Sequence, residues 1–170
     1  MEQPEVLEQP GRAPVRRRTH LLLAAAAVLA VAGWAADHDL REQEERAVAG
    51  CREAATAATA RTDASMAMIR AYVQPALLSV PEGSSQDGFF ALVADEALEV
   101  APRMDEALVR CRDVDVLPVH RALQRQRDAY VDHLAARADW LAEIAADGRA
   151  YYRDRPELNR LREAAFPDRS

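Results

Sequence analysis

The sequence contains one run of sixteen residues, from Leu21 to Ala36, without a charged or strongly polar side chain. An α-helix rises about 1.5 Å per residue, so this run spans roughly 24 Å, slightly less than the hydrocarbon layer of a bilayer. Thr19 and His20 can extend it, and we predict a transmembrane helix over residues 20–36. A buried helix of a soluble domain is the alternative, but such a helix normally carries a polar face and this run has none.

Charged residues flank the two ends of this run unequally. Arg16, Arg17 and Arg18 directly precede it, whereas Asp37 and Asp39 follow it. Because arginines next to a single span tend to stay on the cytoplasmic side, we expect the N-terminus to lie inside the cell. The sequence therefore predicts a single-pass protein of the cell membrane with an extracytoplasmic C-terminal domain.

Two other interpretations of the N-terminal segment concern its processing. A cleaved signal peptide also combines a basic region, an apolar run and small residues. Trp34 lies where an interfacial aromatic residue is expected and the helical pattern continues past Ala36, so we favour a retained anchor. The string Val48-Ala49-Gly50-Cys51 resembles a lipidation site, but it follows a charged stretch that would have to enter the membrane. We therefore exclude lipidation.

Composition separates the remaining regions. The first 19 residues contain three prolines, Gly11 and several glutamates, a mixture that buries little apolar surface, so we predict a disordered cytoplasmic tail over residues 1–19.

The whole chain has 22 basic and 28 acidic residues, a net charge of −6. Nucleic-acid-binding proteins present clustered positive charge, so we expect no nucleic-acid partner.

Apolar residues in positions 37–170 recur mostly every three or four positions, the spacing of one helix face. No segment alternates with period two. Pro75 ends or kinks the first of these helices, turn-forming residues follow at 81–85, and Gly148 is placed to end the third helix. We predict an all-α fold in which the transmembrane helix is followed by an antiparallel bundle of three to four helices. These helices cover approximately residues 37–79, 87–112, 115–148 and 156–166, with Asp87 and Asp115 as the expected N-caps.

The same spacing identifies the side chains that should point into the bundle. They are Leu40, Ala47, Val48, Cys51, Ala54, Ala55, Ala58, Met66, Ile69, Val73, Phe89, Phe90, Leu92, Val93, Ala97, Leu98, Met104, Leu108, Cys111, Val116, Val119, Leu123, Tyr130, Leu134, Leu141, Ile144, Leu158, Leu161, Ala165 and Phe166.

The sequence has two cysteines, Cys51 and Cys111, on the expected inner faces of the first two outer helices. A hairpin centred near Ser84 places one 33 positions before its tip and the other 27 positions after it. The difference corresponds to about 9 Å of helix rise, which the proline-containing tip can absorb. Because the extracytoplasmic compartment permits oxidation, we predict a disulfide between them. Two buried free thiols are the alternative.

Residues with reactive or metal-binding side chains form no recognisable constellation. His38 stands between Asp37 and Asp39 with Glu42 one turn on and could hold a cation, but a solvated linker is the preferred interpretation. His20, His120 and His133 lack the set of spaced partners that a metal site needs, so we expect no metal and no cofactor. Ser84 and Ser85 do not form a nucleophile elbow, so we expect no catalytic residue.

Two groups of side chains are candidates for binding. Phe89 and Phe90 would form a docking surface if exposed, although burial in the core is the default expectation. Arginines at two places could receive an anionic ligand or partner, although solvated helix faces and ends explain them without a further assumption and are preferred: Arg121 with Arg125, and Arg153 with Arg155 beside Tyr151 and Tyr152.

The sequence therefore indicates an architecture and not an enzymatic activity. We expect a non-enzymatic interaction or accessory module of the cell envelope, which contacts the lipid bilayer and binds another envelope protein or a copy of itself. A small-molecule-binding or sensor-type helical bundle is the alternative, since bundles can hold ligands between helices. A hydrolase or metal enzyme comes third.

Overall fold

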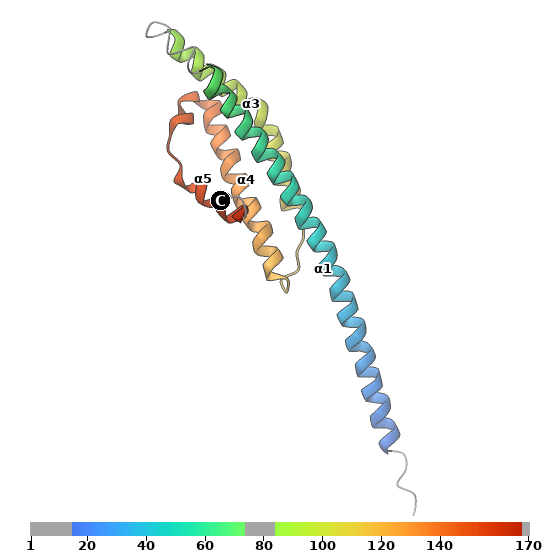
Figure 1. Cartoon of the computed structure of the whole chain (residues 1–170). Coiled ribbons are helices and arrows are strands. Elements are labelled where there is room, and N and C mark those ends of the chain that lie inside the picture. The colour runs from blue at the N-terminus through green and yellow to red at the C-terminus, as the bar shows by residue number, and fades with distance from the viewer. Residues whose placement is uncertain (1–14, 74–83, 168–170) are drawn as a thin grey trace, which may run out of the picture. The chain divides into compact units, whose positions relative to one another are not determined.

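The fold was taken from a computed structural model that describes residues 15–73 and 84–167 (Figure 1). Within these ranges every regular element is a helix, which confirms the all-α prediction. The helices are α1 (Val15–Met68) with its π-helical continuation η1 (Ile69–Val73), α3 (Ser84–Arg112), α4 (Arg121–Ala146), the 3₁₀ helix η2 (Gly148–Tyr152) and α5 (Pro156–Ala165).

Residues 15–19 belong to α1, so the prediction of a disordered tail is wrong for these positions. The rest of that tail, and the end of the helix expected over 37–79, lie outside the described residues. The chain divides into two compact units, Met1–Arg41 and Glu42–Ser170.

The first unit contains the apolar part of α1. Its large apolar side chains Leu23, Val28, Leu29, Val31 and Trp34 are all between 64% and 72% exposed. Among the described residues, one helix, starting at Leu23, is long and apolar enough to cross a membrane. The side chains of Arg16, Arg17, Arg18 and Leu21 lie outside those that the structure describes.

In the second unit, the part of α1 that follows Glu42 packs against α3 and α4. Cys51 on α1 is bonded to Cys111 on α3, and the Ser65 hydroxyl on α1 donates a hydrogen bond to Glu96 on α3. The residue number increases along α1 and decreases along α3 between these two contacts, so the helices run antiparallel. Thr59 and Asp63 on α1 contact His133 and Arg137 on α4, respectively. The residue number increases along both helices between these contacts, so α4 is parallel to α1. Alanines supply much of the interface, which lets the helices approach closely.

Most of the side chains expected to point inward are buried, including Cys51, Met104, Tyr130, Leu134 and Leu141. Leu40, Ala47, Leu92, Leu98 and Val119 are exposed, so the prediction is wrong for these five. Leu92 directly precedes the buried Val93 and Leu98 directly follows the buried Ala97, so the buried stripe of α3 is narrower than the apolar pattern suggested.

The link between α3 and α4 departs from the sequence prediction. Residues 114–120 are not helical and α4 begins at Arg121, so Asp115 is not its N-cap. Pro118 disfavours a helical conformation at Leu117, and the Leu117 N–H donates a 2.9 Å hydrogen bond to Glu44 Oε1 on α1. This long-range bond holds the link in a non-helical form, and Val119 points outward from it.

The end of α4 depends on Gly148. A Cβ atom at this position would lie 2.0 Å from the carbonyl oxygen of Phe90, so only glycine allows η2 to approach α3 this closely. The helix ends at Ala146, and the Asp147 side chain accepts a hydrogen bond from the Arg149 N–H at the start of η2.

Candidate binding site

The second unit contains a pocket of about 540 Å³ whose lining combines arginine and aromatic side chains. We call it the arginine pocket. Its lining comes from α1 with η1, from α4, from η2 with the loop after it, and from α5. Five arginines and two aspartates carry its charge: Arg70, Arg137, Arg153, Arg155, Arg162, Asp63 and Asp154.

Asp63 on α1 organises two of these arginines. Arg137 Nη2 lies 2.5 Å from Asp63 Oδ1, and Arg162 Nη1 lies 3.4 Å from Asp63 Oδ2. Arg137 is only 7% exposed, whereas the Asp63 side chain is 36% exposed, so the arginine half of this ion pair is removed from water. A guanidinium at such a position needs a partner charge, which Asp63 supplies.

Two aromatic rings lie against the arginines. The Arg137 Cζ atom is 5.4 Å from the centroid of the Trp140 ring, and the Arg70 Cζ atom is 5.7 Å from that of Tyr151, both within the range of cation–π attraction. Arg70 Nε also donates a 3.2 Å hydrogen bond to the Tyr151 hydroxyl. The two rings are inclined by 25°, with centroids 6.4 Å apart. The pocket therefore has rings and guanidinium groups that support each other's positions.

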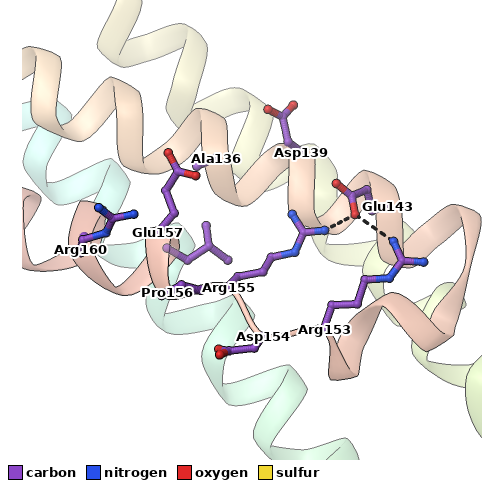
Figure 2. Close-up of a pocket in the computed structure, with 10 residues that line it drawn as sticks. Ala136, Asp139, Glu143, Arg153, Asp154, Arg155, Pro156, Glu157 and Arg160 are labelled. Atoms are coloured by element: carbon purple, nitrogen blue, oxygen red, sulfur yellow. Dashed lines mark hydrogen bonds and ion pairs between the residues drawn. The ribbon is translucent and has the colours of Figure 1, made fainter.

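A neighbouring pocket of about 560 Å³ shares Arg153, Asp154, Arg155 and Leu158 with the arginine pocket (Figure 2). Both arginines bind Glu143, with Arg153 Nη1 at 3.5 Å, and Arg153 Nη2 lies 3.3 Å from Asp147. The lining of this second pocket holds four carboxylates and three guanidinium groups. Its lining thus has a small excess of negative charge, whereas the lining of the arginine pocket has an excess of positive charge.

A buried histidine lies behind the arginine pocket. His133 Nε2 is 3.1 Å from the Thr59 hydroxyl, and the ring packs edge-on against Phe166. Burial, together with the positive charges of Arg137 and Arg162, lowers the pKa of His133 to about 4. The ring is therefore neutral at physiological pH and acts as a packing and hydrogen-bonding group.

Several residues singled out from the sequence lie apart from this site. Cys51 and Cys111 form a disulfide, with their Cα atoms 4.8 Å apart. Phe89 is buried and Phe90 is half-buried, and both rings contact Tyr152, so the pair is not an exposed docking surface and the default expectation of burial holds.

The remaining candidates are distributed over both units. Trp34 and Ala36 are exposed in the first unit. His120 pairs with Glu44, and Arg121 and Arg125 are exposed on α4. Among the described residues, no three His, Cys, Asp or Glu side chains gather in a way that could hold a metal ion.

The structure brings part of one predicted arginine group into the pocket. Arg153, Arg155 and Tyr151 line it, whereas Tyr152 packs on the phenylalanines. Sequence reasoning missed the rest of the lining that carries charge or rings, namely Asp63, Arg70, Arg137, Trp140, Asp154 and Arg162. The spacing of Arg137 and Trp140, three positions apart on one helix face, was the available signal.

No known protein family, curated protein or solved structure matches this chain.

Proposed function

We propose that this chain is a single-pass membrane protein that presents a non-enzymatic helical interaction module outside the cell membrane. The observation that carries the proposal is the apolar segment of α1 in the first unit. Its large side chains from Leu23 to Trp34 are exposed, and no described residue covers them. A helix with apolar side chains on every side is stable in lipid, where its backbone groups are satisfied internally.

Two independent features support the proposed orientation. The arginine triplet at 16–18 favours a cytoplasmic N-terminus. The disulfide between Cys51 and Cys111 belongs to the part of the chain that follows the apolar segment, and such bonds persist in oxidising compartments. Both features support a proposal in which the second unit lies on the outer side of the membrane.

The proposed role follows from the surfaces that the second unit offers. Charged side chains surround the arginine pocket, and an alanine-lined groove lies between α1 and α3. These surfaces are suited to binding another envelope protein or a second copy of the chain. Cross-linking in intact membranes distinguishes the two, because a copy gives a homodimer band and an envelope protein gives a band of different mass.

A topology experiment tests the anchor. The full chain carries different tags at its two ends, and intact cells are treated with a protease that cannot cross the membrane. We expect the C-terminal tag to be removed and the N-terminal tag to be protected, with the chain resisting alkaline carbonate extraction. A soluble C-terminal product that lacks the N-terminal tag would show a cleaved signal peptide and contradict the proposal.

A matched pair of variants adds a quantitative control. Leu29→Arg introduces a charge into the middle of the span, where it costs about 3 kcal/mol of insertion free energy, so the fraction extracted by carbonate should increase. Leu98→Arg makes the same change at an exposed position of α3 and should leave extraction unchanged. Equal extraction of the two variants would argue against membrane insertion of the apolar segment.

A further inference from the structure

We propose that the arginine pocket binds a carboxylate or phosphate group carried by a small molecule with a flat apolar body. This site is additional to the anchoring role and does not depend on which side of the membrane the second unit occupies. Four properties of the pocket support it: its charge, its unsatisfied donors, its aromatic wall and its size.

The first property is an excess of positive charge. Two of the five lining arginines, Arg153 and Arg155, already bind Glu143, and Arg153 also binds Asp147. Glu143 and Asp147 together with the lining residues Asp63 and Asp154 supply four negative charges against the five arginines. One positive charge therefore remains unbalanced. The net charge of the whole chain is −6, so this pocket is locally positive in a protein that is negative overall. An anion neutralises it.

The second property is a pair of unsatisfied donors. The Nε atoms of Arg137 and Arg155 are buried and make no hydrogen bond to any described residue. A buried donor without an acceptor costs about 1–3 kcal/mol, and a ligand oxygen recovers this cost when the side chains around the donor shift to admit it. Asp63 and the Trp140 ring already fix the Arg137 guanidinium, so binding loses little side-chain entropy. The forked geometry of guanidinium suits planar or tetrahedral oxyanions.

The third and fourth properties define the rest of the ligand. Trp140 and Tyr151 present rings at one wall, and Met66 and Leu158 add apolar surface. A volume of about 540 Å³ falls within the range of small-molecule sites and is far larger than a free phosphate ion needs. A ring that bears the anionic group would occupy this space and stack beside the aromatic wall.

Tryptophan fluorescence of the full chain tests the proposal. The sequence has two tryptophans, so Trp34→Phe leaves Trp140 as the reporter. The protein is titrated in a non-ionic detergent with phenyl phosphate, benzoate, inorganic phosphate and the uncharged benzamide. We expect a saturable change with phenyl phosphate or benzoate, and at least tenfold weaker binding of benzamide and of inorganic phosphate. The tighter of the two aromatic anions identifies the source of the group as a phosphate ester or a carboxylic acid.

Arginine variants then assign the binding to the pocket. Arg162→Gln and Arg70→Gln should each weaken binding about tenfold, the effect of losing one charged hydrogen bond. Arg103→Gln is the matched control, because Arg103 is exposed on α3 and lines the alanine groove instead. Thermal unfolding of each variant establishes that it is folded.

Three outcomes would overturn the inference. The first is a folded protein that gives no saturable response to either aromatic anion. The second is benzamide binding as tightly as benzoate, which would exclude a role for the charge. The third is an equal loss of binding in the Arg103 and Arg162 variants. None of these outcomes bears on the topology experiment, so the two proposals fail separately.

Discussion

Glu44 Oε2 on α1 lies 2.5 Å from His120 Nδ1, at the end of the link between α3 and α4. The other carboxylate oxygen accepts a hydrogen bond from the Leu117 N–H. Burial acts to raise the pKa of Glu44, but the hydrogen bonds from Leu117 and His120 outweigh it and lower the pKa below its usual value. The carboxylate is therefore charged at neutral pH and ties this link to α1.

Replacing this carboxylate should destabilise the second unit. Glu44→Ala leaves the Leu117 N–H without its acceptor, and we expect the free energy of unfolding to fall by about 2 kcal/mol in denaturant titrations of the full chain in detergent. Glu53→Ala, an exposed position on the same helix, is the control and should change it by less than about 0.5 kcal/mol. The Glu44 contribution is present above the usual carboxylate pKa and is lost as the pH falls through the lowered value. Similar losses in both variants would mean that the link does not depend on Glu44.

His133 should make stability depend on pH in a different window. Its folded pKa of about 4 lies below its unfolded value of about 6.5, so the unfolded chain binds the extra proton first as the pH falls. We expect the full His133 contribution above pH 6.5 and a loss of about 1 kcal/mol per pH unit from there toward pH 4. His133→Gln lacks this titration, and its stability curve should be flatter over this interval. Parallel curves for the two proteins would rule out a buried neutral imidazole.

The disulfide should contribute a large share of the stability of the second unit. It joins residues separated by 60 positions, and closing a loop of this length stabilises a fold by about 4 kcal/mol in the chain-entropy model. The double variant Cys51→Ser, Cys111→Ser should lose this amount in denaturant titrations, and reductant should lower the wild-type protein to the same level. Reductant acting on the double variant is the control and should have no effect. An unchanged wild-type unfolding midpoint under reduction would contradict the prediction.

Two glycines allow a paired test of the contact between η2 and α3. Gly148→Ala places a methyl group against the backbone of Phe90, and we expect a loss of about 2 kcal/mol or more. Gly88→Ala, inside α3, meets nothing within 4 Å and should stabilise the helix by about 0.5–1 kcal/mol. We therefore expect the unfolding midpoint to fall in the Gly148→Ala variant and to rise in the Gly88→Ala variant. An unchanged midpoint in the Gly148→Ala variant would show that η2 does not lie this close to α3.

The sequence allowed the helices to be predicted because their apolar spacing is a local property. The regions of α3, α4 and α5 lie close to their predicted ranges, and the two cysteines on the inner faces of two helices pointed to their pairing. The link at 114–120 was predicted as helix because its conformation depends on Glu44, which lies 73 positions from Leu117. No local pattern reports such a bond.

The arginine pocket was only partly predictable for a similar reason. Arg153 and Arg155 stand next to Tyr151 in the sequence, and that cluster was visible. Arg70 and Arg137 come from separate helices, and their approach depends on how α1 and α4 pack. The burial of Phe89 also required η2, a short helix that has no clear apolar period and is placed by the close approach of Gly148.

The position of the disulfide has a consequence for proteolysis. Cys51 lies on the helix that contains the apolar segment, and Cys111 lies near the end of α3. A protease that cuts any single peptide bond between these residues produces two fragments that remain covalently joined. Shedding of the C-terminal fragment from a cell surface would then require reduction as well as hydrolysis.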